Sequence, residues 1–317
     1  MTGEFDLIST YFSPLAGPEG LGLIDDAACV PASSSEDFVI TKDLLVENVH
    51  FRSQDPINLI AYKSLAVNIS DCVAKGAKPY LYWLGLALPK DIKNDWMQQF
   101  SSGLSEAQAA FGCKLAGGDT TATSGPIVIS ITLMGKVPKG QMLKRAGAQV
   151  GEDVYVTGTL GDAALGLWCL KNEKPEASSL IAAYQKPSPP FIFAQALCGL
   201  ATSSADVSDG LIADADHIAR VSGVGMELPQ NDLPISAETG SLLENEPSLW
   251  PKVWAGGDDY QTIFTAPIHL REKIMLLSKK LKTRVSMIGK VTRGQGVLLL
   301  DKRGQTVQVT ARGYTHF

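Results

Sequence analysis

Residues 55–76, DPINLIAYKSLAVNISDCVAKG, predict a long helix. Asp55 is a candidate cap, and Pro56 suits the first helical position, where a missing N–H costs nothing. Gly76 ends the helix after Lys75.

Asp71 lies late in this helix, where the helix dipole disfavours an anion. Ser64 and Asn68 share its face at the spacing i, i+4 and i+7. Helix stability does not require an aspartate at this position. We therefore expect Asp71 to bind a metal ion; the alternative is a solvated helix end.

Asp71 belongs to one of six short aspartate motifs that recur along the chain. Most of them lie where an apolar run meets Gly, Ser or Thr. Carboxylates that converge from many parts of a chain need a compensating charge, which hard divalent cations supply, and small neighbours leave room for phosphate oxygens. The pattern indicates an enzyme with a magnesium–phosphate substrate, and its motifs are Asp25-Asp26, Asp43, Asp71, Gly117–Thr120, Asp206–Gly210 and Gly256–Tyr260.

Asp43 follows a predicted apolar strand, residues 38–41, and precedes a second apolar stretch, residues 44–46. A carboxylate between apolar segments needs a partner, because burial of a free charge is costly. We expect a metal ion there, to which Thr41 can add an oxygen. A local cap or an ion pair is the alternative.

Two other motifs are weaker by themselves. The side chains of Asp25 and Asp26 diverge if the backbone is extended, so that one binds metal and the other points away; a polar turn is the alternative. Residues 117–120, Gly-Gly-Asp-Thr, allow the backbone to approach an oxyanion, although this sequence is also common in turns.

Two loops are candidate phosphate sites. Asp206 and Ser208 share one face of an extended segment, and a helix is predicted over 211–221 just beyond it. Its first N–H groups either meet phosphate or are capped by Ser208 or Asp209.

The second loop, residues 158–161, resembles a phosphate loop, but Asp162 would repel an anion, so we interpret it as a capped helix start. Arg145 is a candidate phosphate clamp, unless it is an isolated surface arginine.

The expected fold class is α+β, with two mixed α/β domains. A polar stretch, residues 138–152, divides them into residues 1–140 and 141–317. Besides the helix already described, the patterns predict helices over 4–12, 94–111, 211–221 and 269–281, and strands over 38–41, 82–88, 126–137, 153–157, 261–265, 296–300 and 306–310.

Composition excludes several classes of protein. The chain has 317 residues, 45% apolar and 19% charged, which suits two globular domains. Its net charge of −5 and lack of a basic run argue against nucleic acid as a partner. No basic and apolar leader and no membrane-spanning apolar run is present, so no membrane is expected. Five scattered cysteines indicate a reducing cytoplasm.

The ordered set of motifs resembles the thiamine-monophosphate kinase family, in the superfamily of aminoimidazole ribonucleotide synthetase and selenophosphate synthetase. The resemblance covers essentially the whole chain. Each segment is weak alone, but the ordered set is specific; the segments are Asp25–Ala27, Asp43 with Val46 and His50-Phe51, Ala66–Asp71, Gly117–Thr120, Val156–Thr159, Asp206–Leu211, Gly256–Tyr260 and Gly313–Phe317.

The resemblance implies an N-terminal domain that forms a homodimer, a C-terminal α+β domain and a site between them. It implies direct in-line transfer of phosphate from ATP to thiamine phosphate, with several Mg²⁺ ions. The positions that match magnesium ligands are Asp26, Thr41, Lys42, Asp43, Asp71, Asp119, Asp206 and Asp209. Those around ATP are Gly118, Asp119, Arg145 and Ser208, those around thiamine phosphate are His50, Asp258 and Phe317, and the expected catalytic residues are Asp43, Asp71, Asp119 and Arg145.

The chain departs from the family pattern at three positions. Lys42 replaces a hydroxyl residue before the metal aspartate, and Ile24 replaces a glycine before the aspartate pair. Asp258 replaces a glutamate and is one methylene shorter. The other functions considered are another ATP-dependent enzyme of the superfamily, a metal-dependent phosphohydrolase and a cation-stabilised dimeric scaffold.

Overall fold

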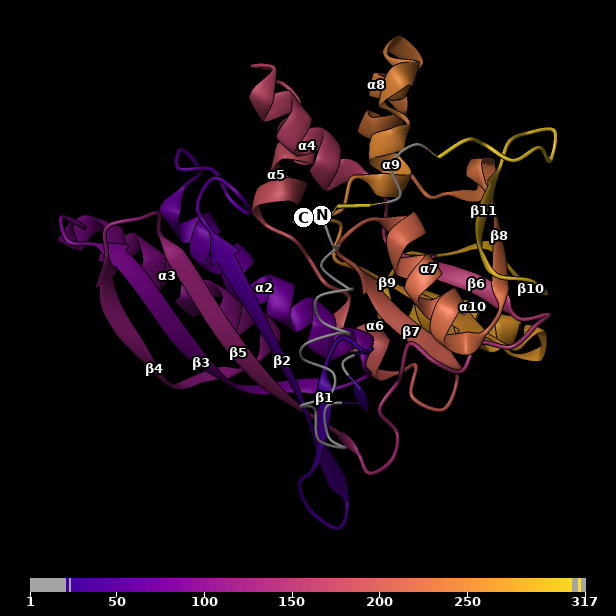
Figure 1. The fold of residues 1–317 in the computed structure, drawn as a ribbon, viewed down its shortest axis with the longest axis horizontal. Coiled ribbons are helices and arrows are strands. Elements are labelled where there is room, and N and C mark those ends of the chain that lie inside the picture. The colour runs from indigo at the N-terminus through magenta and orange to yellow at the C-terminus, as the bar shows by residue number, and fades with distance from the viewer. Residues whose placement is uncertain (1–20, 23, 310–312, 315–317) are drawn as a thin grey trace.

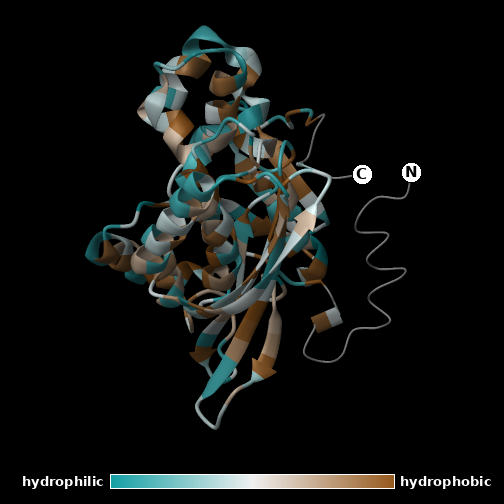
Figure 2. Ribbon diagram, turned by 90° about the vertical axis from the view of Figure 1, so that its left-hand side faces the viewer, coloured by the Kyte–Doolittle hydropathy of each residue, from teal (hydrophilic) through white to brown (hydrophobic). Residues whose placement is uncertain are grey.

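The computed structural model describes residues 21–22, 24–309 and 313–314, and Figure 1 shows two β-sheets with helices packed on them. The helix expected over 4–12 lies outside the described residues. Hydrophobic and hydrophilic residues alternate in bands along the strands (Figure 2), as expected for sheets with one face toward a core. Within the described residues no helix is both long and apolar enough to cross a membrane.

The first sheet has five strands in the order β1-β2-β5-β3-β4. Its pairs are antiparallel except β3 with β4. Every second residue of β5 is buried, including Ile129 and Ile131, because this face meets the helices. The strands are β1 (Ala28–Pro31), β2 (Glu36–Val46), β3 (Lys78–Pro89), β4 (Lys114–Thr123) and β5 (Val128–Pro138).

Helices α2 (Ile57–Ala74) and α3 (Asn94–Phe111) belong to the same half of the chain. α2 is buried on nearly all sides because it packs on α3, on β2 and β5, and on β7 of the second sheet. The predicted helix is confirmed, but the predicted cap is wrong. Asp55 instead accepts hydrogen bonds from the Arg52 N–H at 2.9 Å and from Gln185 at 3.0 Å.

The second sheet has six strands in the order β11-β8-β10-β6-β9-β7. They are β6 (Asp153–Thr157), β7 (Ser203–Val207), β8 (Gly225–Pro229), β9 (Gln261–Ala266), β10 (Val285–Thr292) and β11 (Gly296–Leu300). The helices of this half are α4 (Asp162–Lys171), α5 (Ser178–Gln185), α6 (Phe191–Gln195), α7 (Leu211–Ser222), α8 (Ala237–Asn245), α9 (Pro251–Ala255) and α10 (Arg271–Leu281).

The mixed fold with two sheets is confirmed. The strand expected over 306–310 is wrong for its described part, because Thr306 forms only an isolated bridge with Leu300. Strands β1, β4, β7, β8 and β10 were not predicted. All but β4 are short, and their apolar residues also suit loops or helix ends. Residues 139–152 separate the sheets, which supports the proposed division at residue 140.

The two halves are not packed independently. Ala194 of α6 belongs to the core of the first sheet, and Phe191 packs against that core. Phe191 meets Phe111 of α3 edge to face, with 5.9 Å between the ring centroids. These contacts and those of α2 with β7 fix the first half against the second.

The close packing of α3 against α2 can be tested by adding a methyl group at their contact. A Cβ at Gly103 of α3 would lie 1.9 Å from the Asn58 carbonyl oxygen of α2, so Gly103→Ala forces the helices apart. We expect a loss of about 1–3 kcal/mol in the free energy of unfolding by urea, as for other overpacked cores. Ser102→Ala, at an exposed position of the same helix, is the control. Equal stability of the two variants would refute this packing.

Candidate functional site

A cavity of about 440 Å³ opens between the two sheets. Its walls come from β2, from α2, from the loop after β7 and from residues 256–260. It therefore collects segments that are far apart in the sequence. Among the expected site residues, those that line it are Lys42, Asp43, His50, Asp71, Asp206, Ser208, Asp209 and Asp258.

Three carboxylates form the centre of the site. Asp26, Asp71 and Asp206 each offer an oxygen, and these oxygens lie within 4.8 Å of one another. Ser70 donates a hydrogen bond of 2.7 Å to one oxygen of Asp206, and Thr41 donates one to Asp71. The other oxygen of Asp206 is buried without a hydrogen-bond partner in the structure. An unsatisfied buried anion beside two others fits a divalent cation.

The pKa values of Asp43, Asp71 and Asp206 are raised because these carboxylates are buried close to other negative charges. Burial raises the pKa of Asp206 to about 7, and the charge of Asp26 adds to the shift. Burial, with the charges of Asp43 and Asp206, raises the pKa of Asp71 well above its ordinary value. Burial and the charge of Asp209 raise the pKa of Asp43 to about 6. Without a compensating cation, the cluster therefore holds protons near neutral pH.

Asp26 is the exception, because two cations contact it. Lys75 contacts one oxygen and Arg145 the other. Burial opposes ionisation of Asp26, but the charges of Arg145 and Lys75 outweigh burial and lower its pKa. Asp25 lies 2.8 Å from the same Lys75 Nζ and accepts a hydrogen bond of 3.1 Å from the Arg145 N–H. The two adjacent aspartates therefore meet at one ammonium, and the expected divergence of their side chains is wrong.

Asp258 lies at another wall of the cavity. It accepts a hydrogen bond of 2.8 Å from Lys63 and one of 2.8 Å from the Tyr260 hydroxyl. Lys63 also lies 3.9 Å from the centre of the Tyr184 ring. His50 accepts a hydrogen bond of 3.0 Å from the Val46 N–H. These contacts place a carboxylate, a cation and aromatic rings together.

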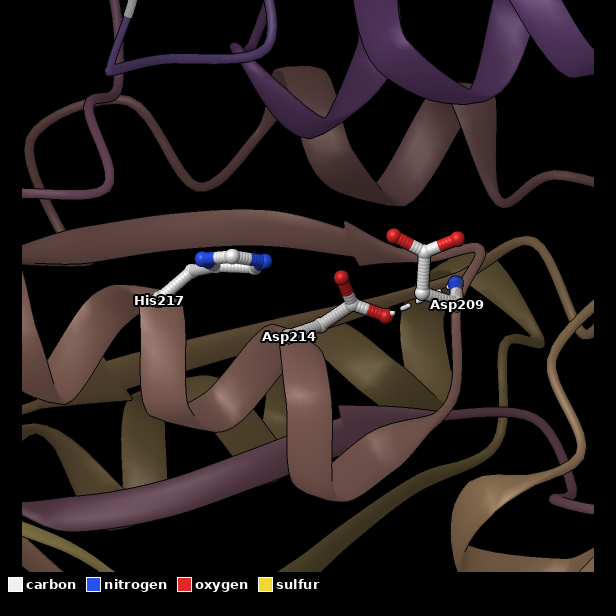
Figure 3. A group of neighbouring side chains, drawn as sticks. All are labelled: Asp209, Asp214 and His217. Carbon is white, nitrogen blue, oxygen red and sulfur yellow. Dashed lines mark hydrogen bonds between the residues drawn. The ribbon is translucent and has the colours of Figure 1, made fainter. Parts of the chain in front are cut away.

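Figure 3 shows Asp209, Asp214 and His217 as a separate group at the start of α7. One oxygen of Asp214 accepts the N–H groups of Ser208, Asp209 and Gly210 at 3.1–3.2 Å. These three N–H groups precede the helix, which begins at Leu211, and neither Ser208 nor Asp209 caps it by its side chain. Binding of phosphate by the first N–H groups of the helix itself stays a prediction. Burial and the charge of Arg145 lower the pKa of His217 to about 4.

The loop of residues 158–161 is also satisfied from within the protein. The Gly161 N–H donates to both carboxylate oxygens of Asp259, at 3.0 and 2.9 Å. Thr159 donates a hydrogen bond of 2.6 Å to Asp162. The interpretation of this loop as a capped helix start agrees with these contacts, with Asp259 as the capping group.

Four expected site residues are placed elsewhere or turned away. Gly118 and Asp119 lie in the exposed edge strand β4 and do not line the cavity. Arg145 faces Asp26, and Lys42 directs its amine to Ser130 at 2.6 Å. A metal contact at Lys42 would therefore come from its backbone. Phe317 lies outside the described residues.

Lys63 and Lys75 of the α2 segment were not predicted as site residues, although both are buried. The detectable signal was two lysines in a helix whose other residues are mostly apolar, because a buried ammonium requires an anionic or carbonyl partner. Asp214 was overlooked as well. Its role depends on the loop before α7 folding back, which local patterns do not show.

The class of protein is given by the N-terminal half of the chain. Residues 24–137 match the family described as AIR synthase related protein, N-terminal domain. The chain is 36% identical to the thiamine-monophosphate kinase of Caulobacter vibrioides, over 99% of this chain and 90% of that one. It is 37% identical to that of Escherichia coli K12, over 99% and 98%.

Two solved structures are also similar to this chain. A structure described as AaThiL complexed with AMPPCP and TMP has a TM-score of 0.87 and 32% identity and covers 99% of this chain and 97% of that one. The thiamine-monophosphate kinase of Stenotrophomonas maltophilia has a TM-score of 0.81 and 35% identity, over 93% and 94%. The chain belongs to the thiamine-monophosphate kinase family.

The raised pKa of Asp206 generates a test in metal-free protein. The folded state keeps a proton that the unfolded chain releases between pH 3.8 and about 7, so the free energy of unfolding falls as pH rises through this range. We expect Asp206→Asn to reduce the fall between pH 5 and 8 by about 1–3 kcal/mol, measured by urea unfolding in chelator. Asp95→Asn, on the exposed face of α3, should leave it unchanged. An unaltered pH dependence in Asp206→Asn would contradict the prediction.

Proposed function

We propose that the protein transfers the terminal phosphoryl group of ATP to thiamine phosphate, which yields thiamine diphosphate and ADP. The proposal rests mainly on one cavity between the sheets. The carboxylates of Asp43, Asp71 and Asp206 and the Lys63–Asp258 pair all line it. Support comes from the match to the kinase family over 99% of the chain and from a related structure that contains AMPPCP and TMP.

The donor set supports binding of Mg²⁺. Asp71 and Asp206 supply oxygens that lie within 4.8 Å of each other, and one buried oxygen of Asp206 has no hydrogen-bond partner in the structure. Asp26, Asp43 and Asp209 lie around them, with Thr41 beside Asp71. When bound, Mg²⁺ ions would screen the charge of the two phosphorylated substrates and of the migrating phosphoryl group.

The chain itself contributes position and charge. A phosphate nucleophile is already an anion near neutral pH, so a strong general base is not required. The Ser70 hydroxyl of α2 donates a hydrogen bond to the Asp206 carboxylate of β7 and holds it in place, which avoids reorganisation during the reaction. Arg145 adds fixed positive charge at Asp26. Catalysis is then mainly the alignment of two anionic substrates.

The acceptor would lie at the Asp258 wall. Lys63 can meet a phosphate oxygen, and His50 borders the same cavity. Tyr260 and Tyr314 line the cavity there, and a thiazolium cation on such a ring gains about 0.5–2 kcal/mol. Phe317 would join them from the end of the chain.

The protein is proposed to be a cytoplasmic homodimer. Tyr80, Trp83 and Leu115 of β3 and β4, with Leu44 of β2, are large apolar residues that the first sheet leaves exposed. Helices α2 and α3 occupy the opposite face of that sheet (Figure 1), so a second copy could cover the open one. Gly118 and Asp119 lie on the same exposed edge, and a dimer would enclose them. All five cysteines are free, which suits the cytoplasm.

Removal of one central carboxylate tests the activity. Asp43→Asn and Asp71→Asn should each lower turnover by about 100-fold or more, because each removes a charge that holds the cations. ADP and thiamine diphosphate are measured after incubation with Mg-ATP and thiamine phosphate, and the melting temperature reports the fold. Asp232→Asn, at an exposed site, is the control.

Full activity in either variant would remove that residue as a ligand. Release of inorganic phosphate without thiamine diphosphate by the unaltered protein would identify a phosphohydrolase instead.

Asp258 provides a second test, specific to the acceptor. Asp258→Asn leaves Lys63 without its anion, and Asn tolerates the left-handed backbone at this position, where φ is +65°. We expect KM for thiamine phosphate to rise about 10-fold while KM for ATP stays constant. Asp258→Glu retains the charge and should restore KM. An unchanged KM in Asp258→Asn would remove Asp258 from the acceptor site.

A further inference from the structure

Lys75 is a buried cation at the base of the carboxylate cluster. It follows the last turn of α2, and its side chain is 0% exposed. Its Nζ lies 2.8 Å from an Asp25 oxygen, contacts an Asp26 oxygen and donates a hydrogen bond of 2.8 Å to the Ser204 carbonyl. An ammonium has three N–H groups, so all three are used. Lys75 is therefore fixed in one position.

The three acceptors come from different parts of the fold. Asp25 and Asp26 precede β1 of the first sheet, whereas Ser204 lies in β7 of the second. Asp206, two residues further along β7, belongs to the group of three carboxylates. Lys75 thus holds the first sheet, α2 and β7 together at the place where the carboxylates meet.

A lysine at a helix end is usually explained by the helix dipole. The helix dipole does not explain the position of Lys75, because its amine is buried and contacts Asp25 and Asp26 instead of lying in solvent. Asp26, Asp71 and Asp206 carry three formal negative charges, and Asp26 has Lys75 on one oxygen and Arg145 on the other. On the Lys75 side, a protein cation occupies a position that a divalent cation would otherwise fill.

We propose that Lys75 is a positioning residue that replaces one divalent cation at Asp26. The inference rests on the proposed function, since it requires that the neighbouring carboxylates bind Mg²⁺. A fixed ammonium orients Asp26 toward Asp71 and Asp206 before any metal binds. It also lowers the number of ions that the site requires. A lysine with a purely structural role would stabilise the fold without altering metal binding.

Metal counting separates these roles. Mn²⁺ replaces Mg²⁺ as the probe, and free Mn²⁺ is measured by electron paramagnetic resonance in full-length protein without nucleotide. Lys75→Met frees one Asp26 oxygen, so this variant should bind one Mn²⁺ more per chain than the unaltered protein. Lys75→Arg keeps the charge and should match the unaltered protein. Lys78→Met removes the same charge at an exposed position three residues away and should also match it.

The same number of ions with the same affinity in Lys75→Met and the unaltered protein would overturn the proposal while leaving the metal cluster in place. No bound Mn²⁺ in either protein would overturn the metal cluster and this inference together.

Lys75→Met leaves Asp25 buried without its cation and could prevent folding. The double variant Asp25→Asn/Lys75→Met removes both charges of that pair and still frees Asp26. We expect Mn²⁺ to raise its melting temperature more than that of the unaltered protein. A lower melting temperature with no additional Mn²⁺ effect would show a purely structural lysine and refute the proposal.

Discussion

The structure depends on the mutual repulsion of carboxylates that the fold brings together and buries. Asp26, Asp71 and Asp206 come from three separate segments and lie close enough to share one cation. Their approach is possible because hydrogen bonds from Thr41 and Ser70 and the cations around Asp26 offset part of the repulsion. A divalent metal ion would offset the repulsion that remains, as proposed for an enzyme acting on two phosphorylated substrates.

Helix α2 organises this arrangement. It carries Ser70 and Asp71 toward β7, and its N-terminal half carries Lys63 to Asp258. Because it packs on elements of both sheets, the carboxylates of Asp71 and Asp206 keep a fixed separation from Asp258. The same helix thus contributes to the core, the contact between the two halves and both walls of the cavity, so that a change in its packing would reach every part of the site.

Much of this was predictable from local patterns. The strand before Asp43, the helix that carries Asp71 and the carboxylate ensemble follow from periodicity, caps and the cost of isolated buried charge. Short strands such as β7 were missed because five residues contain little periodic signal. The partners of Asp25 and Asp258 were missed because they are distant in sequence. The positions of Gly118 and Asp119 on an exposed edge could not be predicted, since strand order depends on pairing across the whole sheet.

The sequence by itself determined which chemistry the protein can perform, because aspartates beside small residues in that order specify a metal–phosphate site. Only the tertiary structure decided how each aspartate is used. Asp26 meets two protein cations, Asp206 keeps a free oxygen, and Asp214 and Asp259 satisfy backbone N–H groups at helix starts. The physical reason is that a carboxylate has the same local signature in each role, and its partner is chosen by long-range packing.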